Sequence, residues 1–367
     1  MREIAVPNLL RGKSLLAAVD IQKLPKILLH EHLDGGPRPA TIIELARDQK
    51  YDGLPSKDAA GLAEWFHQNA QRGNLPEYLE GFQHTTSVMQ TAEALERIAY
   101  EFIEDMYEDG VIYAEVRFSP IFHTHMGLSQ DEAVMAVIKG LKRGRQVYGV
   151  QWGLIICAMR HLTASLETAE LAIRWRDAGV VGFDLAGSEP GFSVKKHAEA
   201  LQTIANANFH LTVHAGETFG PDDIWQALHY CGAHRLSHAT RLWDDIEVMA
   251  DGSLKLGQLA QFILDRRVPL EMCLLSNRHT GAVPLTEEHP FAPLFRNGFR
   301  VFLNTDDRLM SNTSMTKETS LATDLFDFSL DDLEKLALNA IKSAFIPFDQ
   351  RTEMIEKIIR PGYGKFR

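Results

Sequence analysis

Histidines recur in this sequence at the ends of short apolar runs, where they could bind a metal ion. His30 and His32 follow the run at residues 27–29, and His214 follows the run at residues 211–213. Residues two apart in an extended chain point to the same side, so His30 and His32 can face one ion. Neutral imidazole is a common zinc ligand. The pattern predicts a metal site, and the alternative is a pair of buried histidines bonded to the backbone.

Carboxylates and a further histidine extend this set. Asp306 and Asp307 follow the apolar run at residues 301–303, although such a pair is also common in turns and helix caps. With Asp306, three imidazoles and one carboxylate would leave a position for water on a metal that lowers the pKa of that water. Glu217 and His238 then remain as acid and base candidates. Expelling an amine from an aromatic carbon requires a proton for the ring nitrogen and an oriented, deprotonated water.

These residues need a scaffold that gathers the ends of several strands. Strands are predicted at residues 26–29, 111–118, 152–158, 180–184, 211–213, 235–237, 269–273 and 301–303. Helices are predicted between them at residues 92–108, 130–148, 165–178, 194–205, 221–229, 254–265 and 290–296. This alternation predicts an α/β fold, a (β/α)8 TIM barrel, whose chemistry lies where the strands end. We expect a single domain over residues 1–367, with extra helices inserted after the first strand at residues 37–109.

Composition limits the classes of partner. The 367 residues are 45% hydrophobic and carry a formal net charge of −11, which argues against binding nucleic acid or an anionic membrane. Cys157, Cys231 and Cys273 are far apart in apolar surroundings, which favours reduced core residues. Arg11 and Lys13 interrupt the apolar N-terminal stretch, so no secretory signal is expected. No run approaches the ~20 apolar residues of a membrane span. We therefore expect a cytoplasmic protein with a small-molecule substrate.

Six motifs resemble, in order, those of the adenosine deaminase family. They are LHEHLDGG at 29–36, YAEVRFSP at 113–120, DLAGSE at 184–189, VHAGE at 213–217, SN with TGA at 276–282, and LNTDD at 303–307. The resemblance runs from about Pro25 to Glu318. It implies a zinc-dependent barrel of the amidohydrolase (metallo-dependent hydrolase) type. It also implies hydrolysis of adenosine and 2′-deoxyadenosine to inosine or 2′-deoxyinosine and ammonia, a reaction of purine salvage.

The resemblance implies roles for individual residues. One zinc ion per subunit would be held by His30, His32, His214 and Asp306. A zinc-bound water would attack C6 of the purine while Glu217 protonates N1. His238 would orient that water and help to deprotonate it, and Asp306 would also contact it.

The resemblance also implies a set of substrate contacts. Asp307 would bond the N7 side of the purine, the backbone N–H of Gly187 would meet N3, Asp34 would bind ribose hydroxyls, and His32 would line the same site. An apolar gate over the purine is implied for a helix that carries Leu75, Tyr78, Leu79 and Phe82 at positions i, i+3, i+4 and i+7. Core packing is the alternative interpretation of this stripe.

The sequence departs from the family pattern at three positions. Glu31 between the histidines is unusual, Ala239 stands where glycine is frequent, and Arg308 stands where many members have proline. None of these changes removes a predicted ligand or acid.

Other functions are weighed against this one. Adenine deaminases tend to have Ile-Glu-Gly where this chain has Leu33, Asp34 and Gly35, and an AMP deaminase would need a basic pocket. A nucleoside-binding barrel without catalysis would have lost a ligand or Glu217. Zinc deaminases of the cytidine type need two cysteines close together, which this chain lacks. The oligomeric state is left open.

Overall fold

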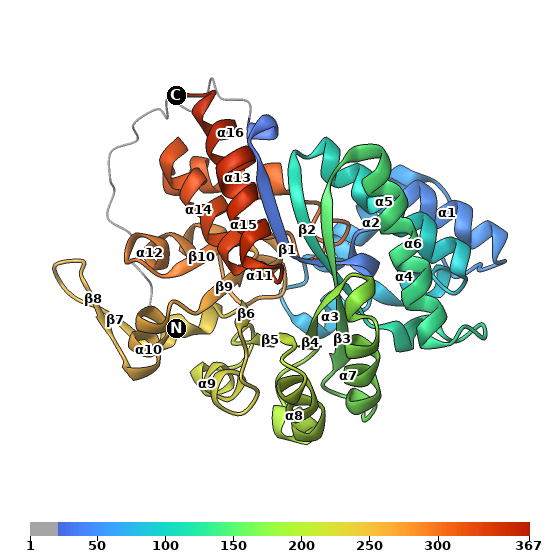
Figure 1. Ribbon diagram of the computed structural model, residues 1–367, viewed down its shortest axis with the longest axis horizontal. Helices are drawn as coiled ribbons and strands as arrows, with labels where there is room; N and C mark the ends of the chain where they lie inside the picture. The colour runs from blue at the N-terminus through green and yellow to red at the C-terminus, as the bar shows by residue number, and fades with distance from the viewer. Residues whose placement is uncertain (1–20) are drawn as a thin grey trace.

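A sheet of eight parallel strands forms the centre of the molecule in a computed structural model that describes residues 21–367. Figure 1 shows these strands surrounded by helices. The strands follow the order β1-β2-β3-β4-β5-β6-β9-β10. Their bounds are β1 (Lys26–His32), β2 (Val111–Phe118), β3 (Gln151–Met159), β4 (Val180–Ala186), β5 (His210–Ala215), β6 (Arg235–His238), β9 (Pro269–Met272) and β10 (Arg300–Leu303). All eight predicted strands are present, and the predicted (β/α)8 barrel is confirmed.

The first strand and the segment after the last strand close the barrel. Glu31 and Asp306 form a parallel bridge. The N–H of His32 donates to the carbonyl of Asp306 at 2.8 Å, and the N–H of Asp306 donates to the carbonyl of His30 at 3.0 Å. Closure of the barrel therefore fixes the backbone of Asp306 beside the two histidines of β1.

Helices surround the barrel and bury their apolar faces in the core. They are α1 (Pro39–Asp48), α2 (Ala59–Ala70), α3 (Leu75–Leu79), α4 (Phe82–Val88), α5 (Ala92–Glu108), α6 (Gln130–Tyr148), α7 (Ser165–Arg174), α8 (Ala198–Asn206), α9 (Pro221–His229), α10 (Gln258–Arg266), α11 (Leu274–His279), α12 (Phe291–Arg296), α13 (Met315–Phe326), α14 (Leu330–Ser343), α15 (Phe348–Met354) and α16 (Arg360–Gly364). Local signals define their ends. Helix α6 begins with a capping box of Ser129 and Glu132 and ends at Gly149, whose φ is +78°.

The predicted insertion at residues 37–109 contains α1 to α4 in addition to the barrel helix α5. Figure 1 shows these helices gathered beside β1 and β2. The predicted continuous helix from Leu75 to Phe82 is interrupted, because α3 ends at Leu79 and α4 begins at Phe82. Hydrogen bonds to the third preceding carbonyl, such as Glu80 N–H to Glu77 O at 3.2 Å, replace the α-helical pattern there.

The predicted helix at residues 254–265 begins too early. Leu254–Leu256 is strand β8, which pairs antiparallel with β7 (Ile246–Val248), and α10 begins only at Gln258. Asp245 fixes this start: its carbonyl accepts the N–H of Gly257 at 2.7 Å and its side chain accepts the N–H of Ala260 at 2.8 Å. The start of the helix therefore depends on Asp245, a residue outside the predicted segment.

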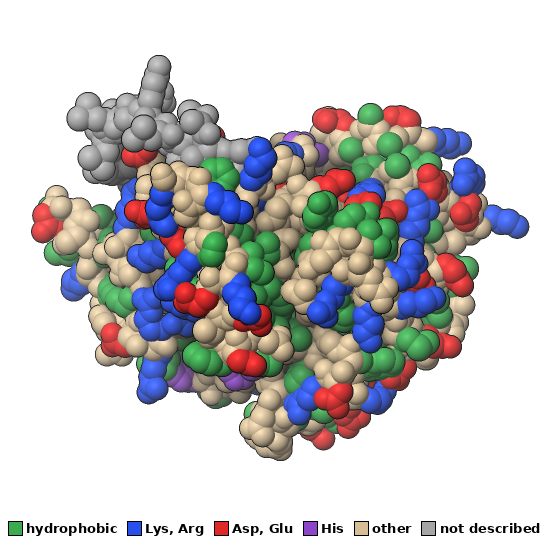
Figure 2. All heavy atoms as spheres, turned by 45° about the horizontal axis from the view of Figure 1, so that its top comes forward, with side chains coloured by type: hydrophobic (Ala, Val, Ile, Leu, Met, Phe, Trp, Pro, Cys, Tyr) green, Lys and Arg blue, Asp and Glu red, His purple; other side chains and the backbone are tan. Residues whose placement is uncertain are grey.

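The described part of the molecule has buried cysteines and a surface of mixed charge. Cys157, Cys231 and Cys273 are buried and free of disulfide bonds, as predicted. Figure 2 shows positive and negative side chains interspersed over the face in view. No helix within residues 21–367 is long and apolar enough to cross a membrane. The predicted absence of a secretory signal concerns residues that lie outside the described part of the chain.

Candidate active site

Four potential metal ligands converge at the carboxyl ends of the strands. His30 and His32 lie on β1, His214 lies on β5, and Asp306 follows β10. One ligand atom from each lies within 4.8 Å of the others. The sequence predicted that β1 and β5 end before these histidines, but both strands continue through them, so paired backbone holds the imidazoles.

The geometry of this cluster fits a divalent metal ion. His32 Nε2 lies 3.3 Å from His214 Nε2, and His30 Nε2 lies 2.9 Å from Asp306 Oδ1. Burial lowers the pKa of His32 well below its ordinary value, so this imidazole is neutral and carries a lone pair. Three imidazole nitrogens and one carboxylate oxygen are a donor set that suits zinc.

A buried charge network orients the imidazoles from behind. His214 Nδ1 lies 3.1 Å from Asp184 Oδ1, and His30 Nδ1 lies 3.1 Å from Glu271 Oε2. Arg117 joins the two carboxylates, at 3.3 Å from Asp184 and 2.9 Å from Glu271. An acceptor at Nδ1 keeps the hydrogen on that nitrogen and leaves Nε2 free for a metal.

Glu217 lies in the turn after β5 and is held there through its backbone. Gly216 has φ +70°, and a Cβ at this position would lie 2.4 Å from Ile224. The Glu189 carboxylate accepts the N–H groups of Glu217 at 3.1 Å, Thr218 at 2.9 Å and Phe219 at 2.5 Å. Burial, followed by the nearby carboxylates of Asp306 and Glu189, raises the pKa of Glu217 well above its ordinary value. This shift favours the protonated form of the Glu217 side chain.

A chain of hydrogen bonds fixes the tautomer of His238. The N–H of Phe291 donates to His289 Nδ1 at 3.1 Å, so the hydrogen of neutral His289 lies on Nε2, which contacts Asn277 Oδ1 at 3.1 Å. The Asn277 amide nitrogen then donates to His238 Nδ1 at 3.0 Å. Burial lowers the pKa of His238 well below its ordinary value, so the ring is neutral and its hydrogen lies on Nε2.

Three non-glycine residues at this end of the barrel have left-handed backbone conformations. The φ angles are +66° at His238, +54° at Ala239 and +63° at Asp306. Such conformations are costly for residues with a Cβ and tend to occur at functional sites. Ala239 stands where the family often has glycine, and its left-handed conformation gives a physical reason for that preference.

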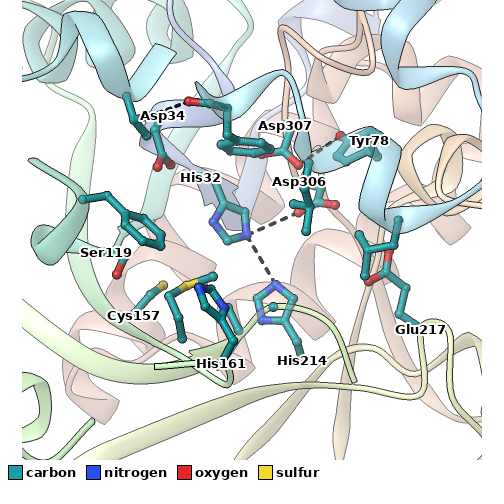
Figure 3. Close-up of a pocket in the computed structure, with 18 of the residues that line it drawn as sticks. His32, Asp34, Tyr78, Ser119, Cys157, His161, His214, Glu217, Asp306 and Asp307 are labelled. Atoms are coloured by element: carbon teal, nitrogen blue, oxygen red, sulfur yellow. Dashed lines mark hydrogen bonds and ion pairs between the residues drawn. The ribbon is translucent and has the colours of Figure 1, made fainter. Parts of the chain in front are cut away.

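The cluster opens into a cavity of about 280 Å³. The predicted site residues that line it are His32, Asp34, Leu75, Tyr78, Leu79, Phe82, Gly187, His214, Glu217, His238, Asp306 and Asp307. His30 does not line the cavity and contacts Asp306 from within the barrel. Figure 3 shows Glu217 on one side of His32 and His214, and Asp34, Ser119 and His161 on the other side.

Several residues of the site were not predicted from the sequence. Ser119, Phe122, Met159 and His161 line the cavity, and among residues 21–367 no lysine or arginine does so. Glu189 and Ser119 lie inside motifs that carry the family resemblance, and this is the signal that could have identified them. His161 and Met159 follow from the position of the β3 end, which the sequence placed one residue early.

Asp34 is almost fully buried at the side of the cavity away from Glu217. Its Oδ1 has no hydrogen-bond partner in the described part of the chain, and His123 Nε2 lies 3.9 Å from its Oδ2. Burial raises the pKa of Asp34 to about 7. A buried carboxyl oxygen without a partner favours a ligand that supplies a hydrogen-bond donor.

The barrel and its histidine–aspartate cluster define the class of metal-dependent hydrolases with a (β/α)8 fold. A family model described as adenosine deaminase matches residues 25–361. The chain belongs to the adenosine deaminase family.

Individual relatives agree with this assignment. The chain is 50% identical over 352 residues to adenosine deaminase 1 of Streptomyces coelicolor, covering 95% of this chain and 89% of that protein. It is 49% identical over 349 residues to an adenosine deaminase of Mycobacterium marinum, and the match covers 94% of this chain and 96% of that protein.

Solved structures give the same fold with other named substrates. An adenine deaminase from Arthrobacter aurescens superposes with a TM-score of 0.82 at 24% identity, covering 94% of this chain and 99% of that chain. An Arabidopsis N6-methyl-AMP deaminase superposes with a TM-score of 0.79 at 28% identity, covering 94% and 99%. Structural likeness alone therefore does not select the substrate.

Proposed function

We propose that this protein is an adenosine deaminase, which hydrolyses adenosine and 2′-deoxyadenosine to inosine or 2′-deoxyinosine and ammonia. The observation that carries the proposal is a single cavity that joins the ligand cluster to the buried acid Glu217 at one side and to Asp34 at the other. A purine at the Glu217 side would place its ribose toward Asp34. A carboxyl group there suits ribose hydroxyls, which donate hydrogen bonds.

The chemistry assigned to the site follows from the protonation states of its side chains. His30, His32, His214 and Asp306 would hold one zinc ion, which lowers the pKa of water and so supplies a nucleophile at neutral pH. The protonated form of buried Glu217, which its raised pKa favours, would donate its proton to N1 and so make C6 more electrophilic.

The tautomer of His238 refines its implied role. With its hydrogen on Nε2, neutral His238 would orient the attacking water as a hydrogen-bond donor. Because Nε2 already carries a hydrogen, it has no lone pair with which to accept a proton from the water. The carboxylate of Asp306 is therefore the better candidate to take that proton.

The substrate contacts remain part of this proposal. N7 accepts hydrogen bonds, so Asp307 would donate to it as a protonated carboxyl group, a form that burial and the neighbouring Asp306 favour by raising the pKa of Asp307 well above its ordinary value. The N–H of Gly187 would meet N3. The four cover residues, Leu75, Tyr78, Leu79 and Phe82, would close over the ring. The cavity wall lacks lysine and arginine within residues 21–367, and these are the side chains that most often bind the phosphate of a nucleotide. We also propose that residues 21–367 form one domain; residues 1–20 of the predicted domain lie outside the described part of the chain. A cytoplasmic location is proposed as well, which suits buried free cysteines.

Ammonia release from adenosine, 2′-deoxyadenosine and adenine, measured in parallel with zinc-loaded protein, tests the proposal. We expect rapid release from the two nucleosides and almost none from adenine. Release from adenine alone would contradict the role of Asp34. No release from any of the three compounds would reject the proposed function.

A further inference from the structure

Tyr78 differs from the other cover residues because its hydroxyl group contacts the barrel. Its side chain is 1% exposed and lines the cavity together with Asp307. The hydroxyl donates to Asp307 Oδ2 at 2.9 Å and lies 3.1 Å from Ser311 Oγ. Figure 3 shows this bond between α3 and the segment after β10. The sequence interpretation treated Tyr78 only as an apolar member of the cover.

The Asp307 carboxyl group is otherwise confined by the backbone around it. A Cβ at Gly35 would lie 1.8 Å from Asp307 Oδ1, so the carboxyl packs directly on the Gly35 backbone. The N–H of Asp307 donates to the carbonyl of Thr305 at 2.8 Å, and its carbonyl accepts the N–H of Ser311 at 2.9 Å. The Tyr78 hydroxyl, which reaches the carboxyl group from α3, further restricts its orientation.

The same hydroxyl group also anchors a weak structural element. Helix α3 has five residues, too few to be stable alone, so its position depends on contacts with its surroundings. Asn74 caps its first turn, and the neighbouring Gly73 N–H donates to the carbonyl of His279 at 3.0 Å. These contacts hold the start of α3, whereas Tyr78 holds the part that lies over the cavity.

We propose that the Tyr78 hydroxyl is a positioning group that orients Asp307 toward the N7 edge of a bound purine while it holds α3 over the cavity. The inference rests on the proposed function, which places a purine beside Asp307. It predicts that Tyr78 contributes to selectivity for rings with a nitrogen at position 7. A hydroxyl that only anchored the cover would affect all nucleosides alike.

The test compares two product-like ligands, inosine and 7-deazainosine, which differ only in the nitrogen or CH group at position 7. Their dissociation constants are measured by calorimetry on zinc-loaded protein, which does not turn them over. Tyr78→Phe keeps the ring and removes the hydroxyl. We expect the loss in inosine binding to exceed the loss in 7-deazainosine binding roughly five- to tenfold, because a looser α3 weakens both ligands alike and only inosine also loses the oriented Asp307.

A matched control is Tyr363→Phe, which removes a buried hydroxyl that donates to the carbonyl of Leu333 at 3.2 Å and does not line the cavity. We expect this variant to bind both ligands as the unmodified protein does. An unchanged zinc content and an unchanged thermal unfolding midpoint would confirm that Tyr78→Phe remains folded. Equal weakening of both ligands, or unchanged discrimination, would overturn the inference. Failure of the unmodified protein to bind inosine would contradict the proposed function and this inference together.

Discussion

Glu217→Gln replaces the buried acid by an amide of nearly the same shape. The amide can still donate a hydrogen bond to N1 but cannot release a proton. General acid catalysis contributes roughly 10²- to 10⁴-fold, so we expect kcat to fall by that factor, or about 3–5 kcal/mol of transition-state stabilisation. KM and zinc content should change little, because the hydrogen bond remains and Glu217 is not among the clustered ligands.

Initial rates of ammonia release, zinc analysis and calorimetric binding of inosine together measure this effect. The unmodified enzyme should also lose kcat/KM as the pH rises through the elevated pKa of Glu217, because only the protonated carboxyl can act. A matched control is Glu318→Gln, since Glu318 is also fully buried but does not line the cavity. A Glu217→Gln protein that keeps a kcat within about tenfold of the original, or that loses zinc, would refute the reasoning.

Three further predictions concern the surroundings of the site. Asp184→Asn removes the carboxylate that orients His214 Nδ1, so zinc affinity in a chelator competition should fall roughly 10- to 100-fold; an unchanged affinity would contradict that role. Asp34→Ala should raise the KM for adenosine more than it lowers kcat, and unaltered kinetics would exclude Asp34 from the substrate site. Burial raises the pKa of Glu318 to about 8 from an ordinary value of 4.5, so folding binds a proton and the free energy of unfolding falls as pH rises between these values. Gln does not titrate, so the free energy of unfolding of Glu318→Gln, measured by urea denaturation, should rise relative to that of the unmodified protein between pH 5 and pH 8, by at most about 4 kcal/mol. A difference between the two proteins that stays constant over this pH range would contradict the prediction.

Elements with strong local patterns could be predicted from the sequence. The strand at Val111–Phe118 and the helices at Ala92–Glu108 and Gln130–Tyr148 have the predicted bounds, because apolar periodicity runs through each segment and the N-caps Thr91 and Ser129 directly precede the two helices. The hairpin at Ile246–Leu256 was missed, because the start of the following helix depends on Asp245, a residue outside the predicted segment.

The cluster of potential metal ligands could be predicted, because its residues lie inside the motifs at the ends of the predicted strands. His30, His32, His214 and Asp306 converge as expected, because the barrel brings the ends of its strands to one face.

Contacts between distant segments were not predictable. The Tyr78 hydroxyl meets a carboxyl group 229 residues further along the chain, and the Asn277 amide links His289 to His238. Residue type alone does not identify such partners. They depend on how loops from different strands pack against one another.

The dependence of adenosine deamination on added zinc tests the central claim most directly. Protein stripped of metal by a chelator would receive zinc in steps while ammonia release from adenosine is recorded. We predict almost no release without metal, and a linear rise that ends at one zinc ion per chain. Full activity in the stripped protein, or a rise that continues to two ions per chain, would contradict a single site formed by the three histidines and Asp306.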